Sequence, residues 1–287
     1  MKRSLLARLR SNGVSFLVSA LLLLLAVPLY QSLILGPTGF SQAQSSTGAE
    51  RYTAYLAWIG AHISQFLIDR ALLIIAFILL LSFPYALYRI IVAQEILYQQ
   101  ELEGSKDDEN ENEDDDEDSA EAENDTEGTI EDDGMPDHAW RGKSFVVLAI
   151  WLSIIGLIVY LVGLIASTGY LYIVAKSTGS AIHEGVATYL PLLSIFTNTL
   201  GTGMLGMGIL FFGAMIARTS KNLWPNPWVF FSYAGLFTGA ILCISAVAVF
   251  SAPGTGQSTL TTIATLVFAA WILWLAIMLV RLKPETA

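Results

Sequence analysis

The most polar cluster inside a long apolar stretch of this sequence lies in its second half. It comprises Ser194, Thr197, Asn198, Thr199 and Thr202, and several glycines follow it. Glycines could let a helix bend or break here, and discontinuous helices of this kind line binding sites in transporters. The structural alternative is that the hydroxyls bond back to carbonyls of their own helix while Asn198 bonds to a neighbouring helix. We favour that alternative and keep the cluster as a candidate solute site.

Residues that usually carry catalysis or bind metals are sparse. The histidines His62, His138 and His183 are unpaired along the sequence, and Cys243 is the single cysteine, so no disulfide or cysteine-based metal cluster can form within the chain. The segment 201–206 fits the GxGxxG pattern but lies inside an apolar stretch, which removes the dinucleotide interpretation. We therefore expect no catalytic residues, metal site or cofactor, no nucleic-acid partner, and a non-enzymatic protein.

The elements that carry these residues are long and apolar. Hydrophobic residues make up 54% of the 287 residues and charged residues only 14%. A hydrocarbon core about 30 Å thick needs ~20 apolar helical residues, and only helices or closed barrels satisfy their backbone groups there. Six segments qualify, namely Val14–Leu35, Ala71–Ala93, Ser144–Ala175, Thr188–Ala217, Trp228–Phe250 and Thr259–Val280. The sequence predicts an all-α polytopic integral membrane helical bundle of about six transmembrane helices, with the lipid bilayer as its solvent.

Ionisable residues are absent from the middle of all six predicted segments. Proton relays, ion-coupled carriers and voltage sensors are built from intramembrane ionisable residues. The sequence therefore argues against these mechanisms.

The basic residues predict the orientation. Lys and Arg stay on the cytoplasmic side of a membrane. A cytoplasmic N-terminus places 12 of the 15 Lys and Arg residues inside and leaves only Arg51, Arg70 and Lys176 outside. We expect a cell-membrane protein with both termini cytoplasmic and a basic N-terminus over residues 1–13.

Two features at segment ends support this reading. Trp224 and Trp228 flank a turn and are the predicted interface anchors. The first segment resembles a secretory signal, but its 22 residues exceed the ~7 to 15 of a signal core, so we expect it to stay uncleaved.

A single acidic region accounts for the net charge of −10. Residues 107–137 hold 18 of the 25 acidic residues and no Lys or Arg. Such a segment cannot bury enough apolar surface to offset its conformational entropy, so residues 100–140 are expected to form a disordered acidic cytoplasmic loop. It is either a solvated spacer, which we favour, or a partner-binding segment. The loop divides the chain into a two-span unit over 14–99 and a four-span unit over 141–287.

Residues 51–69 are predicted to form an external amphipathic helix. Tyr52, Tyr55, Leu56, Ile59 and Phe66 share one helical face. The third apolar segment is over-long and should emerge on the same side of the membrane. Together they predict a small outer lobe, which serves either as a docking surface for a protein partner or as packing between over-long helices.

Small residues predict where the spans touch. Helices in lipid approach closely through small side chains. The predicted packing residues are Ser153, Gly156, Gly163, Ser167, Gly201, Gly208, Gly235 and Gly239. The last two form a GxxxG pair, which we interpret as intramolecular packing, with a homo-oligomer as the alternative.

The absence of reactive groups decides the functional prediction. The sequence favours a non-enzymatic accessory, scaffold or partner-binding subunit that acts through its outer lobe or its acidic loop. The alternative is a permease or channel for a small neutral or apolar solute, motivated by the cluster around Asn198.

Overall fold

The computed structural model describes residues 3–45, 50–93, 137–177, 180–223, 226–251 and 259–281. Every regular element within these ranges is helical. The α-helices are α1 Arg3–Leu21, α2 Val27–Tyr30, α3 Phe40–Ser45, α4 Glu50–Ala61, α5 Ile63–Leu79, α7 Asp137–Lys176, α8 Ser180–Ser194, α9 Thr202–Leu223, α10 Asn226–Ser251 and α11 Thr259–Val280, with a further helical segment over 83–93. Three π-helical turns, η1 Leu22–Ala26, η2 Gln31–Leu35 and η4 Ile195–Gly201, and one 3-10 turn, η3 Gly36–Thr38, lie between them.

Six helical segments are long and apolar enough to cross a membrane, which confirms the predicted number of spans. They run over Leu9–Thr38, Ile63–Ala93, Ser144–Lys176, Thr188–Arg218, Asn226–Phe250 and Leu260–Val280. The chain is a multi-pass membrane protein. Its second span begins at Ile63 rather than at the predicted Ala71, so Asp69 and Arg70 lie within it. The helix of the third span, α7, begins at Asp137, so the last residues assigned to the acidic loop are helical.

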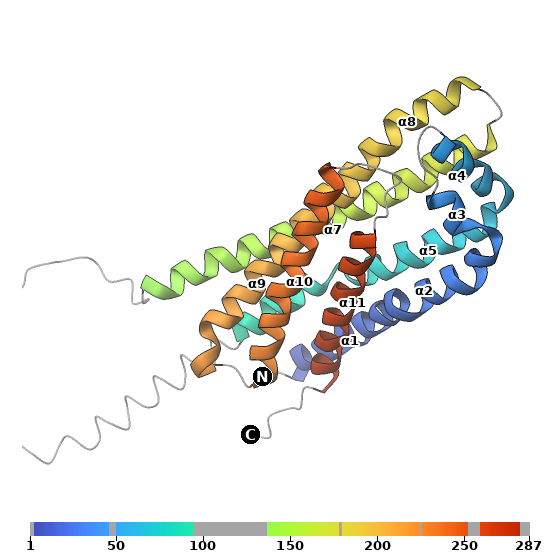
Figure 1. Ribbon diagram of the computed structural model, residues 1–287. Coiled ribbons are helices and arrows are strands. Elements are labelled where there is room, and N and C mark those ends of the chain that lie inside the picture. The colour runs from blue at the N-terminus through green and yellow to red at the C-terminus, as the bar shows by residue number, and fades with distance from the viewer. Residues whose placement is uncertain are drawn as a thin grey trace, which may run out of the picture.

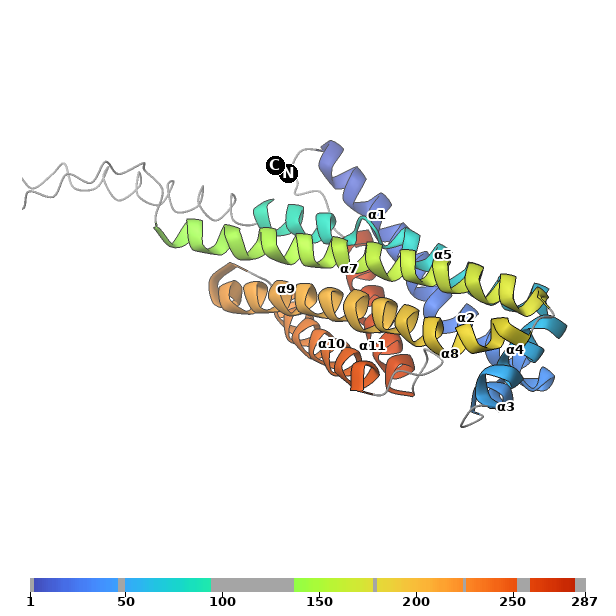
Figure 2. The same ribbon diagram turned by 90° about the horizontal axis from the view of Figure 1, so that it is seen from above.

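The six spans pack alongside one another (Figures 1 and 2), and their contacts close a ring. Each span contacts the next one along the chain, and α1 closes the ring against α11. Their contact is close, because a Cβ placed on Gly13 of α1 would lie 2.9 Å from the Leu279 Cβ of α11. The start of α1 and the end of α11 therefore share one end of the bundle, opposite α3 and α4 (Figure 1).

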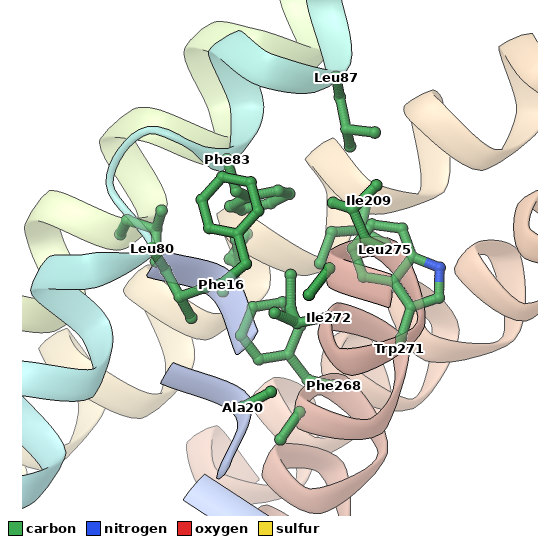
Figure 3. Packing of buried hydrophobic residues seen from close by; sticks show 14 of the residues in the cluster. Phe16, Ala20, Leu80, Phe83, Leu87, Ile209, Phe268, Trp271, Ile272 and Leu275 are labelled. Carbon is green, nitrogen blue, oxygen red and sulfur yellow. The ribbon is translucent and has the colours of Figure 1, made fainter. Parts of the chain in front are cut away.

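Large apolar side chains fill the middle of the ring (Figure 3). Phe16 comes from α1, Phe83 from the second span, and Phe268 and Trp271 from α11. The Phe83 and Trp271 rings meet edge to face at 6.1 Å between centroids, and Trp271 stacks on Phe231 of α10 at 4.7 Å. Buried aromatic side chains from four spans thus pack together inside the ring and stabilise its closure.

The outer lobe is a second, smaller core made by α3, α4 and the adjoining ends of α5, α7 and α8. The predicted amphipathic helix is two elements, because the chain breaks at His62, where φ is −129° and ψ is 39°. Tyr55, Leu56 and Ile59 on α4 are buried. The lobe places them in one cluster with Leu171 of α7 and neighbouring residues of α8.

Prolines mark most of the irregular turns. Proline lacks an N–H and its ring collides with the carbonyl four residues earlier, so a helix kinks or changes register nearby. Pro28 follows η1, and Pro84 follows the turn over 80–82. Pro191 lies inside α8, one turn before the π-helical turn η4. The register change in the fourth span falls on the predicted polar cluster.

Candidate functional site

The polar cluster of the fourth span lies on and beside the π-helical turn Ile195–Gly201. Ser194, Thr197, Asn198 and Thr202 are all buried. A π-turn widens the helix by one residue per turn, and such bulges occur frequently at functional sites. The turn presents the polar side chains inward, towards the third span and the ring interior.

Within the cluster, some side chains form hydrogen bonds inside the fourth span, and one bonds to a neighbouring span. Thr197 donates to the Leu193 carbonyl at 2.7 Å, and Asn198 Nδ2 donates to Ser194 Oγ at 3.3 Å. Thr199 donates to the carbonyl of Ala246 on α10 at 3.1 Å. The cluster therefore does not form a single pocket: Thr199 joins two spans, while Ser194, Thr197 and Asn198 line a cavity.

Two charged residues that were not predicted to be intramembrane lie beside this cluster. Asp69, only 2% exposed, accepts a hydrogen bond from Gln31 Nε2 of the first span at 3.0 Å. Arg70 is partly exposed, and its Nη2 donates to the Tyr55 hydroxyl at 3.3 Å. Its guanidinium carbon lies 5.3 Å from the centre of the Phe66 ring. Arg70 Nε is buried and has no acceptor among the described residues.

The outward neighbours of this pair are apolar. Leu67 and Ile68 on the same helix are 37% and 48% exposed, and Ile173 and Leu192 on α7 and α8 are exposed as well. Such side chains on a membrane bundle face lipid, so the bundle surface beside the two charges is apolar. Intramembrane ionisable residues face the bundle interior or a water-filled cavity and mark functional sites. Asp69 and Arg70 are therefore part of the candidate site.

Two cavities meet at this level of the bundle. The first, of about 40 Å³, lies between the second, third and fourth spans. Its polar lining residues are Arg70, Tyr160, Ser167, Ser194, Thr197 and Asn198. The second, of about 60 Å³, has Gln31, Tyr160, Asn198, Thr261, Thr262 and Thr265 as its polar lining.

Tyr160 and Asn198 line both cavities and so separate them. The Tyr160 ring is held from the side by Phe77, with 4.4 Å between ring centroids. Taken together, the polar lining of the two cavities extends from Arg70 to the threonines at the start of α11.

The predicted packing glycines of the third and fourth spans lie where α7 meets η4 and α9. A Cβ on Gly156 would lie 2.5 Å from the Leu205 nitrogen, and one on Gly201 would lie 2.8 Å from the Tyr160 nitrogen. Gly163 faces Thr197, and Gly208 faces Ser153. These close approaches bring Tyr160 of α7 against the polar cluster of the fourth span.

The other predicted positions have different surroundings. Ser167 donates to the Leu164 carbonyl at 3.0 Å and lines the first cavity. Gly235 faces Trp271 of α11, whereas Gly239 faces the Gly206 carbonyl of α9 at 2.7 Å from an ideal Cβ. The GxxxG pair thus contacts two neighbours within the same chain.

The predicted interface anchors are only partly described. Trp228 is buried and meets Phe231 edge to face at 5.6 Å between ring centroids. Trp224, residues 100–136 of the acidic loop, and the side chains of His138 and His183 lie outside the described residues. Trp228 and Trp224 as anchors, and the loop as a spacer or partner site, stay predictions.

Within the described part of the chain, no group of three or more His, Cys, Asp or Glu side chains could hold a metal ion. His62 stacks on Trp58, 5.2 Å between ring centroids, at the break before α5. Cys243 lies on α10, its sulfur 3.9 Å from the Gly203 carbonyl of α9.

The sequence did contain a signal for the missed residues. Phe66, Asp69, Leu73 and Phe77 recur at steps of three and four along α5 and are all buried. Asp69 therefore lies on the same apolar stripe that the second span buries, and Arg70 follows it. Tyr160 lies between Gly156 and Gly163 on the predicted packing seam of the third span, whereas Gln31 carries no such signal.

No protein-family model, curated protein or solved structure matches this chain.

Proposed function

We propose that this protein binds a small hydrophilic solute inside its helical ring and lets it cross the membrane, as a permease or channel does. One observation carries the proposal: polar side chains from five of the six spans line two cavities that share Tyr160 and Asn198. Hydroxyl and amide groups convergent in a membrane bundle favour a hydrophilic solute over an apolar one.

A partner-binding role for the outer lobe has less support. The apolar residues of α4 that would form a docking face, Tyr55, Leu56 and Ile59, are buried against the lobe's own helices. None of the large hydrophobic residues described on α4 is exposed. This packing favours the explanation that the over-long helices cover one another.

We also propose that both termini lie in the cytoplasm of a cell-membrane protein. The support is the distribution of Lys and Arg, of which 12 in 15 fall on the side of the termini. The outer lobe and the nearby cavity beside Arg70 then face the outer side of the membrane.

Osmotic swelling tests the permease proposal. The full chain is placed in phosphatidylcholine vesicles, and light scattering follows the uptake of glycerol, urea, formate and nitrate. We expect at least one of these solutes to enter faster than in protein-free vesicles. Asn198→Leu, which removes the shared polar wall at similar volume, should slow that uptake by about tenfold or more.

A matched pair of threonines provides the control. Thr197 and Thr238 are both buried and both donate to the carbonyl four residues earlier at 2.7 Å, but only Thr197 lines a cavity. Thr197→Val should therefore change the uptake rate, and Thr238→Val should leave it unchanged. Uptake equal to that of empty vesicles for all four solutes, or equal uptake by wild type and Asn198→Leu, would overturn the proposal.

A further inference from the structure

We propose that the cavity beside Arg70 is a binding site for a small monovalent anion, of the size of a halide, nitrate or formate. The inference rests on the proposed function in one respect, since it names the class of solute that the ring would admit.

Arg70 supplies a donor that the protein itself leaves unused. A guanidinium has five N–H donors in a fixed fork, and it is always charged. Its Nη2 is held by the Tyr55 hydroxyl, and the Phe66 ring covers one face. Its buried Nε has no acceptor among the described residues. Buried donors are nearly always satisfied, so the guanidinium that lines this cavity is incompletely hydrogen-bonded by the described residues, and a small acceptor in the cavity would compensate its charge.

The remaining lining of this cavity has the composition of an anion site. None of the described residues that line it carries a carboxylate. The Ser194 oxygen already accepts from Asn198 Nδ2, so its O–H is oriented away from that bond. The Tyr160 hydroxyl offers another donor from the opposite span. Three donors of different spans converge, which is how proteins bind anions without a metal.

The neighbouring acid does not occupy this cavity. Successive residues of a helix point in directions about 100° apart. Asp69 thus faces the first span, where its Oδ1 accepts from Gln31 Nε2, while Arg70 faces the third and fourth spans. The carboxylate lowers the positive potential at Arg70 without filling the site, so it weakens the binding of an anion.

The cavity volume limits the size of the ligand. Its volume of about 40 Å³ is roughly three times the ~10–15 Å³ that one water molecule needs. A monatomic or few-atom anion fits this space, whereas a phospholipid head group does not.

Thermal unfolding of the purified full chain in a neutral detergent tests the site. The protein is kept in sodium gluconate, whose anion is too large for the cavity, and gluconate is replaced by nitrate, formate or chloride at constant ionic strength. We expect at least one of the three to raise the unfolding temperature in a saturable way. Arg70→Gln should weaken the apparent affinity by about tenfold or more.

Arg89 provides the matched control within the same span. Its Nη2 donates to the Tyr85 hydroxyl at 3.0 Å, and its guanidinium lies 4.5 Å from the centre of that ring, so it repeats both contacts of Arg70 away from the cavities. Arg89→Gln should leave the affinity unchanged. Asp69→Asn should strengthen anion binding severalfold, because it removes a nearby negative charge and keeps an acceptor for Gln31.

Several outcomes would overturn the anion site. One is the absence of a shift with all three anions in the wild-type protein. Another is the reverse order of effects, in which Asp69→Asn weakens and Arg70→Gln strengthens binding, as a cation site predicts. A third is stabilisation by added phosphatidylglycerol but by none of the small anions, which assigns Arg70 to a lipid head group. If Arg70→Gln does not fold, Ser194→Ala, expected to weaken binding about threefold, and Asp69→Asn still decide the question.

The result can be separated from that of the permease proposal. Saturable anion-dependent stabilisation without any solute uptake supports the anion site and overturns the permease. Uptake of glycerol or urea that Arg70→Gln does not change, with no anion-dependent stabilisation, supports the permease and overturns the anion site.

Discussion

Ser153 shows how one hydroxyl in this bundle can act against stability. Its Oγ is buried on α7, facing Gly208 of α9, and has no hydrogen-bond partner among the described residues. A buried polar group without a partner loses its hydrogen bonds to water and forms none in the folded protein, which costs free energy. Ser153→Ala should therefore raise the free energy of unfolding, by up to about 1 kcal/mol. This change in the free energy of unfolding is measured in a neutral detergent, by heating the protein or by adding increasing amounts of an anionic detergent.

Ser232 is the control for this prediction. It is equally buried, but its Oγ donates to the Val229 carbonyl at 2.6 Å. Ser232→Ala should lower the free energy of unfolding by about 1 kcal/mol. If Ser153→Ala destabilised the protein as much as Ser232→Ala, the Ser153 hydroxyl would have a partner after all.

Individual residues of the candidate site were predictable to different degrees. The cluster around Asn198 is recognisable in the sequence because polar residues stand out in an apolar run. Asp69 and Arg70 were missed because the second span was started after them, although the buried stripe from Phe66 to Phe77 passes through Asp69. Tyr160 belongs to the predicted packing seam of the third span, but its position at both cavities depends on how that span packs against the fourth.

At the scale of the elements, long apolar runs make the spans predictable, because a continuous apolar run of about 20 residues satisfies its backbone groups in lipid as a helix. Their irregularities were less predictable. Pro191 precedes the polar cluster in the sequence, but nothing there indicates that the turn after it is a π-helical turn that directs Thr197 and Asn198 inward. The predicted single helix over 51–69 is divided at His62, where the sequence has no proline.

The approach of α7 to the fourth span yields a prediction at this scale. A Cβ on Gly156 would lie 2.5 Å from the Leu205 nitrogen and 2.9 Å from the Gly201 carbonyl, and backbone atoms cannot move aside cheaply. Gly156→Ala should lower the free energy of unfolding by about 1–3 kcal/mol, despite the better helix propensity of alanine. It should also slow solute uptake, because the clash displaces the turn that carries Asn198.

Gly169 on the same helix is the control, since nothing lies within 4 Å of a Cβ placed there. Gly169→Ala should leave uptake unchanged and raise the free energy of unfolding by up to about 1 kcal/mol through helix propensity. Equal effects of the two substitutions would contradict the close contact at Gly156.

On the scale of the whole molecule, the closed ring joins parts of the chain that the acidic loop separates in sequence. Phe16 and Phe83 from the first two spans share one core with Phe268 and Trp271 from the last. The cavities likewise need both parts, because Gln31 and Arg70 come from the first and Asn198 and Thr261 from the second. The division into a two-span and a four-span unit stays a prediction about the chain's organisation, whereas the candidate site depends on their assembly.

The membrane orientation can be measured by labelling the two ends of the bundle separately. Ser41 on α3 and Arg281 after α11 are exposed at opposite ends of the bundle. In a Cys243→Ser background, a cysteine introduced in place of Ser41 should react with a membrane-impermeant maleimide on intact cells. A cysteine in place of Arg281 should react only after the cells are permeabilised, because the excess of Lys and Arg, 12 of 15, predicts that this end faces the cytoplasm. The reverse pattern would place the cavity beside Arg70 on the cytoplasmic side, and an anion would then reach it from within the cell.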